Sequence, residues 1–165
     1  MTKRYDGPLS HAQIDSGIES CLNHAERLRR IIEKATSAER GLGIVLACIR
    51  VEELTKILML IEMRSGHPDQ GRWSRFWKDF RDHRAKWQRY GKWRFQDLTD
   101  EQMALELGKV FSGWASTKNA GLYVDYEPSI GFVEPGLLPN FIESALKMGD
   151  ELDEQLRSML RSEKK

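Results

Sequence analysis

The sequence is poor in the residues that mark disulfide-rich and metal-binding proteins. It contains two cysteines, Cys21 and Cys48, and no Cys-x-x-Cys pair. This scarcity excludes a disulfide-stapled fold and indicates reduced core thiols in a cytoplasmic protein. The N-terminus also lacks the apolar core of a secretory signal.

No apolar run is long enough and free enough of charge to cross a membrane. The most apolar segment, residues 43–61, carries Arg50, Glu52, Glu53 and Lys56. Four charges in so short a span would be very costly in lipid. We therefore expect a buried helix here, in a protein without membrane contact.

Neither sign of charge predominates, since 26 basic residues oppose 25 acidic ones. No global field would attract nucleic acid, so any such contact must come from a local patch. A length of 165 residues suits one hydrophobic core. We expect a single domain over residues 1–165, with its core at about 10–161 and a basic C-terminal tail.

Apolar residues recur at spacings of three and four along most of the chain, which predicts an all-α fold. Helices are expected over about residues 11–35, 38–64, 72–90, 99–119 and 139–161. Ser10 and Thr99 are suitable N-cap residues. Residues 121–136 combine proline, glycine and alternating apolar residues, which indicates an ordered extended loop or short hairpin. The expected architecture is an antiparallel bundle of about five helices.

A histidine lies among the aromatic residues of the expected third helix. On a helical wheel, one face collects Trp73, Phe76, Phe80, His83, Trp87 and Tyr90. This pattern places His83 on the aromatic face. Two interpretations stay open, a hydrogen-bonded core histidine and a group that transfers protons near neutral pH.

The second helix carries charges that need partners. Glu52 and Lys56 are four residues apart in the order that favours an ion pair. Such a pair would leave Glu53 to find a partner, and His83, Lys86 or Arg81 of the third helix could supply one. Because buried charges are expensive unless paired, we expect an interior polar cluster. Clusters of this kind are candidate functional sites.

Two further segments offer functional side chains. The stretch at residues 116–126 brings Lys118, Asn119, Tyr123 and Asp125 into a loop between helices, where binding residues are common. The alternative is a helix C-cap followed by apolar residues that plug the core. The stretch at residues 87–95 mixes aromatic and basic residues, which could stack RNA bases, although packing at the bundle end is favoured.

Three segments together, "RVEELTK", "FWKDFRDHRAK" and "KNAGLYVDY", resemble the AbiV-type abortive-infection proteins. These form a bacterial phage-defence branch of the HEPN superfamily. The resemblance implies a HEPN-like antiparallel bundle that commonly forms a homodimer. It also implies a role in stopping infected cells from producing phage, with a phage-encoded protein as a conceivable trigger.

Many HEPN relatives are metal-independent ribonucleases that use an arginine and a histidine separated by four to six residues. In this sequence the corresponding positions before His83 hold Lys78, Trp77 and Phe76, and Arg75 is one residue too far away. A lysine supplies charge but not the two-pronged grip of arginine on phosphate. Whether the chain cleaves RNA is therefore left open by its sequence.

The resulting hypothesis is an effector that acts on RNA or a nucleotide. His83 would be the acid or base, Lys86 together with Arg81 or Lys78 would supply charge for phosphate, and Glu52, Glu53 and Lys56 would orient them. No cofactor or metal is expected, because the Glu-x-x-His spacing of di-metal bundles is absent. The alternative is a non-enzymatic defence module that binds a phage or host protein, in which the polar cluster is purely structural.

Overall fold

The computed structural model describes residues 5–34, 40–66, 68–99, 101–102, 105, 125–127, 131–133 and 141–162. Within these ranges the chain forms five helices and one two-stranded sheet. The elements are α1 (His11–Lys34), α2 (Arg40–Ser65), α3 (Gln70–Arg81), α4 (His83–Arg94), β1 (Asp125–Glu127), β2 (Gly131–Val133) and α6 (Phe141–Ser162). The predicted all-α bundle is confirmed.

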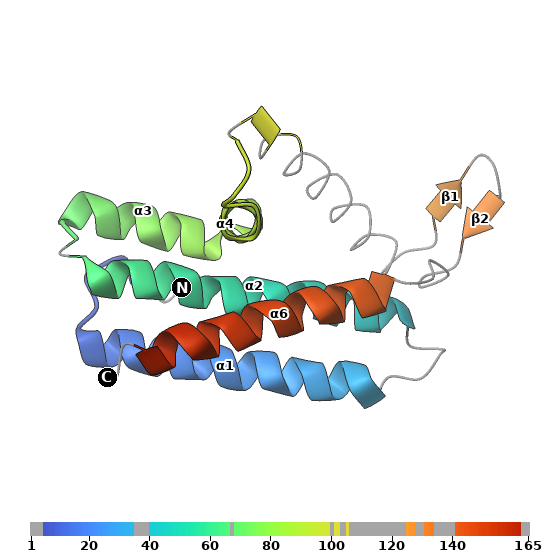
Figure 1. Cartoon of the computed structure of the whole chain (residues 1–165), viewed down its shortest axis with the longest axis horizontal. Coiled ribbons are helices and arrows are strands. Elements are labelled where there is room, and N and C mark those ends of the chain that lie inside the picture. Colours follow the sequence, from blue (N-terminus) through green and yellow to red (C-terminus); the bar gives the residue numbers. More distant parts are fainter. Residues whose placement is uncertain are drawn as a thin grey trace.

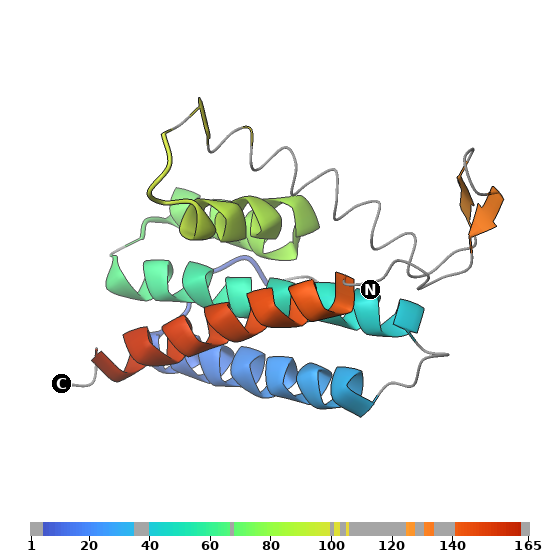
Figure 2. The ribbon, with the colours of Figure 1, turned by 45° about the vertical axis from the view of Figure 1, so that its right-hand side comes forward.

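Helix α2 lies at the centre of the bundle (Figure 1). Helices α1 and α6 pack along one side of it, and α3 and α4 lie on the other. Helix α1 is antiparallel to α2, as Figure 2 also shows, whereas α6 runs in the same direction as α2. Leu54, Thr55 and Ile57 of α2 are fully buried, as expected for a helix surrounded by neighbours.

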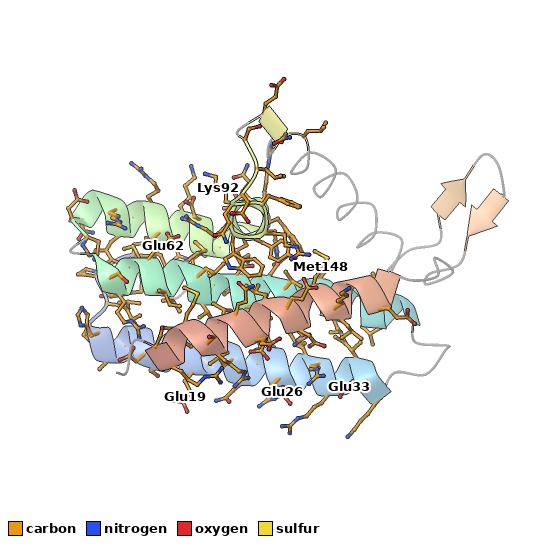
Figure 3. All side chains as sticks on the ribbon, viewed as in Figure 1. Glu19, Glu26, Glu33, Glu62, Lys92 and Met148 are labelled. Carbon is orange, nitrogen blue, oxygen red and sulfur yellow. The ribbon has the colours of Figure 1, made fainter. Side chains whose placement is uncertain are left out.

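Helix α1 begins at the predicted cap. The Gln13 backbone N–H donates to Ser10 Oγ at 3.2 Å, and the Ser10 N–H donates to Gln13 Oε1 at 2.9 Å. These reciprocal bonds satisfy amides that a helix start leaves unpaired. The outer face of α1 carries Glu19, Glu26 and Glu33, which are labelled in Figure 3. The opposite face buries Ile14, Ile18 and Leu28, so α1 is amphipathic.

The prediction of one continuous helix over residues 72–90 is wrong. The chain breaks at Asp82, whose extended backbone ends α3 and caps α4. Asp82 Oδ1 accepts from the Arg84 N–H at 2.7 Å and from the Ala85 N–H at 3.2 Å. Short polar side chains compete with helical hydrogen bonds in this way and favour caps over helix interiors.

The break also corrects the predicted orientation of His83. The helical wheel assumed a continuous helix, but His83 is the first residue of α4 and its side chain is 65% exposed. Trp73 and Phe76 of α3, and Trp87 and Tyr90 of α4, are buried as predicted. Each short helix therefore has its own buried aromatic face, and His83 belongs to neither.

The predicted fourth helix is described only at its start. The Gln102 N–H donates to Thr99 Oγ1 at 3.3 Å, and the Thr99 N–H donates to Gln102 Oε1 at 3.1 Å. This is the predicted cap, and most of the remaining residues to 119 lie outside the described ranges. Strands β1 and β2 pair antiparallel, with Tyr126 opposite Phe132. The hairpin falls inside the predicted extended loop.

A buried arginine joins α6 to α2. Arg50 is 1% exposed, and its Nη2 lies 2.8 Å from Asp150 Oδ1 and 3.9 Å from Asp153 Oδ2. Its Nη1 donates to the Leu146 carbonyl at 3.4 Å. The same Nη1 lies only 2.6 Å from the position that a Cβ on residue 149 would take, so the glycine there makes room for the guanidinium. Leu152 and Leu156 complete the contact as fully buried side chains. Helix α6 is thus held by apolar burial and by the ion pairs of one buried arginine.

Candidate active site at the start of α4

A buried carboxylate on α2 holds the start of α4. Glu52 Oε2 is hydrogen-bonded to His83 Nδ1 and lies 3.4 Å from Lys86 Nζ. Glu52 Oε1 accepts from Trp87 Nε1 at 3.2 Å. The Glu52 side chain is only 5% exposed. Three groups from one turn of α4 therefore converge on a single carboxylate that is removed from water.

This contact sets the tautomer of His83. An ionised carboxylate can only accept hydrogen bonds, so Nδ1 carries the proton that is shared with Glu52. The Nε2 atom of a neutral imidazole then bears the lone pair. In the described part of the chain no hydrogen bond to Nε2 is formed, and the ring is largely exposed. The arrangement is an imidazole base oriented by a carboxylate on a largely exposed ring.

Lys86 compensates the charge of Glu52. Its side chain is 5% exposed, like that of Glu52, and its Nζ lies 3.4 Å from Glu52 Oε2. A buried ion pair requires further hydrogen bonds to offset the loss of hydration, and Trp87 and His83 supply them. Lys86 therefore stabilises the carboxylate that holds His83, and its predicted role towards phosphate stays a prediction.

Glu53 belongs to a different cluster from the one predicted. Its Oε1 lies 2.5 Å from Lys56 Nζ, and its Oε2 lies 3.5 Å from His24 Nδ1 of α1. The predicted Glu52–Lys56 pair is thus wrong, as is the predicted contact of Glu53 with α4. Consecutive helical residues point about 100° apart, so Glu52 faces α4 while Glu53 turns towards α1.

Two members of these clusters were missed in the sequence. His24 lies one turn beyond Cys21 on the edge of the buried face of α1, and this spacing could have indicated its approach to α2. The indole N–H of Trp87 was treated only as part of an aromatic face. Buried indoles usually need an acceptor, which could have suggested a carboxylate partner.

The Glu53 cluster borders a buried thiol. The pKa of Cys21 is raised to about 11, chiefly by burial and also by the nearby Glu53 carboxylate, while Lys56 acts in the opposite direction. A thiol of this kind stays protonated and is a poor nucleophile. Cys21 therefore acts as a packing residue, as expected from its position.

Comparison with known families places these residues in context. The family model of AbiV, a HEPN family, matches residues 13–136, which is more than half of the chain. The chain belongs to the AbiV family. The matched region contains both Glu52 and His83, and the family supports abortive-infection phage defence as the functional class. No curated protein and no solved structure gives a significant match.

Two of the predicted phosphate-binding residues of this AbiV-family protein, Lys78 and Arg81, lie on α3. Arg81 pairs with Asp6 at 2.7 Å and donates to the Tyr5 carbonyl. Lys78 lies with Ser74 and Arg81 around a shallow pocket. Among the described residues, neither Lys78 nor Arg81 makes an ion pair with Glu52 or Glu53.

The predicted loop residues are described least. Lys118, Asn119 and Tyr123 lie outside the described ranges, and Asp125 is described by its backbone alone, opposite Val133 in the hairpin. Their predicted binding role stays a prediction.

The aromatic and basic stretch at the end of α4 is packed. Trp87 and Tyr90 are buried, Arg89 pairs with Glu62 at 2.8 Å, and Arg94 pairs with Glu151 at 3.1 Å. These contacts favour packing over base stacking in the AbiV-family chain.

The part of the chain that the structure describes contains no group of three or more His, Cys, Asp or Glu side chains that could hold a metal ion. None of its helices is both long and apolar enough to span a membrane.

Proposed function

We propose that this AbiV-family protein is an abortive-infection effector that acts on RNA through His83. The observation that carries the proposal is the exposed imidazole whose Nδ1 is held by a buried carboxylate. Histidine oriented in this way is suited to general acid–base chemistry near neutral pH.

RNA is the favoured substrate because it provides its own nucleophile. His83 Nε2 would take the proton of a 2′-hydroxyl as the 2′-oxygen forms a bond to the adjacent phosphorus. The bond from phosphorus to the 5′-oxygen breaks, and water protonates that oxygen. The products are a 2′,3′-cyclic phosphate and a 5′-hydroxyl, and His83 returns its proton to solvent. No metal is required for these steps.

Cationic side chains of α3 would stabilise the charge of the transition state. Lys78 and Arg81 are exposed on the helix that ends next to His83. Lys78 stands at one of the positions where a HEPN ribonuclease has arginine, and it offers a point charge in its place. Arg81 retains the planar donor fork that suits phosphate.

A non-enzymatic defence module is the second candidate. It is favoured by the burial of both Glu52 and Lys86, because a buried pair that ties α4 to α2 has a structural role in its own right. In that case the exposed faces would bind a phage or host protein, and His83 would contribute only stability.

Cleavage of cellular RNA by the purified protein separates the two candidates. We expect His83→Ala and Glu52→Gln to lower the cleavage rate by about 100-fold or more, as for loss of a general base or its orienting partner. His24→Ala is the matched control, since His24 also lies against a glutamate of α2 but in the other cluster. A chelator should leave the rate unchanged.

Urea unfolding of the same variants completes the experiment. Inactive variants with wild-type stability would support catalysis, whereas parallel losses of stability and activity would favour the structural alternative. Intact RNA in every reaction, including those with phage components added, would refute the ribonuclease proposal. The homodimer and the phage-encoded trigger stay predictions, to be tested by light scattering and by co-purification from infected cells.

A further inference from the structure

The segment before α1 is attached to α3 by uncharged contacts. Trp77 Nε1 donates to the Gly7 carbonyl at 2.8 Å, and the Tyr5 ring meets the Trp77 ring edge-on at 5.8 Å between centroids. The Tyr5 hydroxyl donates to the Pro8 carbonyl at 2.5 Å. These contacts position residues 5–8 across α3 without help from charge.

An acidic side chain of this segment reaches a basic one of α3. Asp6 Oδ1 lies 2.7 Å from Arg81 Nη1. The guanidinium is fixed by two further contacts, with the Tyr5 carbonyl and with the Trp77 ring, whose centroid lies 5.3 Å away. Arg81 is therefore held in one orientation, and its partner is a carboxylate, which resembles phosphate in how it accepts from arginine.

More cationic donors surround this contact than Asp6 can satisfy. Ser74, Lys78 and Arg81 share one face of α3 and line a shallow pocket with Asp6. Among the described residues, Lys78 makes no ion pair. Of the acids nearby on the chain, Asp82 has its carboxylate engaged by the amides of α4. Two cations and a hydroxyl thus converge where one carboxylate is bound.

We propose that Ser74, Lys78 and Arg81 form a binding site for an RNA backbone phosphate, and that Asp6 occupies this site as an internal competitor. The inference rests on the proposed function in taking RNA as the ligand. Arg81 precedes His83 by two residues, a span of about 7 Å at most. A phosphate bound at Arg81 would therefore lie close to one presented to His83.

The Asp6 contact is weak enough to be displaced. The Asp6 side chain is 58% exposed and that of Arg81 is 34% exposed. Exposed ion pairs of this kind contribute little stability and are screened by salt. A polyanion that also engages Lys78 would compete effectively, and the segment would remain attached through Trp77. Asp6 would thus set a threshold for RNA binding.

Equilibrium binding of a fluorescent 2′-O-methyl RNA oligonucleotide, which cannot be cleaved by attack of a 2′-hydroxyl, tests the proposal. Asp6→Asn keeps the shape of the side chain and removes its charge. We expect it to tighten the Kd by about two- to fivefold at low salt, the range that corresponds to an exposed ion pair. Lys78→Ala and Arg81→Ala should each weaken RNA binding. Each should also lower the slope of log K against log salt concentration by the amount expected for the loss of about one phosphate contact.

The matched control is Asp15→Asn. Asp15 is 57% exposed and pairs with Arg64 at 2.8 Å. Its replacement changes the net charge by the same amount as Asp6→Asn, but Asp15 belongs to α1 and, among the described residues, does not contact those of the proposed phosphate site. The control should bind like the wild type. Equal affinities of the Asp6 and Asp15 variants, or no binding by any variant, would overturn the proposal.

The outcome can be separated from that of the proposed function. Tighter binding by Asp6→Asn without any RNA cleavage would leave the phosphate site standing and refute the ribonuclease. RNA cleavage that depends on His83, together with unchanged RNA binding by Asp6→Asn, would support the ribonuclease and refute the proposal that Asp6 competes with RNA.

Discussion

Glu52 and Glu53 show how far single residues can be predicted. Their presence in an apolar helix required cationic partners, and both have them in Lys86 and Lys56. The identity of the partners could not be deduced from the sequence. Glu52 and Glu53 point about 100° apart around α2, and this difference decides whether the side chain meets α4 or α1. The favourable order of Glu52 and Lys56 led to a wrong pairing. An ion pair between residues four apart on a helix surface stabilises the helix by only roughly a few tenths of a kcal/mol, so contacts with other helices override it.

Tyr90 offers a prediction at the same scale. Its hydroxyl is buried and has no hydrogen-bond partner among the described residues. An unsatisfied buried polar group costs about 1–3 kcal/mol. Tyr90→Phe should therefore raise the free energy of unfolding by about 1 kcal/mol, measured by urea denaturation. Tyr5→Phe is the control, because the Tyr5 hydroxyl is bonded to Pro8 and its loss should bring no gain.

The same variant should change the pH dependence of stability. Burial raises the pKa of Tyr90 from 10.0 to about 12. The folded state then holds its proton more tightly than the unfolded state, so stability falls as pH rises from about 10 to 12. Tyr90→Phe should remove this decline and keep the one that the Cys21 thiol causes between about 9 and 11. An unchanged profile would contradict the prediction.

At the scale of elements, the most informative feature is the break between α3 and α4. Aromatic periodicity continued through Asp82, so the pattern favoured one helix, and only the capping chemistry of aspartate argued for two. The caps at Ser10 and Thr99 were predictable because each stands before an apolar pattern begins. A capping residue such as Asp82, which stands inside an uninterrupted apolar periodicity, is much harder to recognise as a helix boundary.

Asp82→Ala tests the role of this break. Loss of a capping aspartate costs about 1 kcal/mol, which thermal denaturation should detect. The first turn of α4 should also lose its fixed start, which would disturb His83 and reduce any activity by more than the loss of stability explains. Asp69→Ala is the control, since Asp69 caps α3 through the Arg72 N–H at 2.7 Å and is remote from His83 in sequence. Equal losses of activity in both variants would argue against a special role of the break.

At the scale of the whole molecule, the bundle and its central helix followed from hydrophobic periodicity. The contact between Arg50 and α6 did not, because the residues that it joins are separated by 100 positions. An arginine in an apolar helix requires a counter-charge, but the acidic residues of the chain were too numerous to choose among. The role of Gly149 could not be predicted either, because the sequence does not distinguish a glycine that makes room for a neighbouring side chain from any other glycine.

Gly149→Ala tests this packing. A Cβ at this position would stand 2.6 Å from Arg50 Nη1 and would force a buried, paired guanidinium to move. We expect a loss of about 1–3 kcal/mol, the range for overpacking a core, in urea denaturation. Gly71→Ala in α3 is the control, because the added Cβ would meet only Asp69 Oδ1 at an ordinary 3.5 Å. A normal stability of the Gly149 variant would show that Arg50 relocates easily.

The Arg50 network has a consequence for exchange of segments among AbiV-family proteins. The family match ends at residue 136, whereas the counter-charges of Arg50 are Asp150 and Asp153. A chimera that joined residues 1–136 to another C-terminal helix would bury an uncompensated cation unless that helix carried equivalent acids. Removal of one partner from a fully buried pair costs about 3–5 kcal/mol, and because Asp150 is 45% exposed we expect a loss at or below the lower end of that range. Such a loss would still be a large part of the stability of a small domain. Recombination in this family is therefore expected to preserve the pairing of α2 with its own α6.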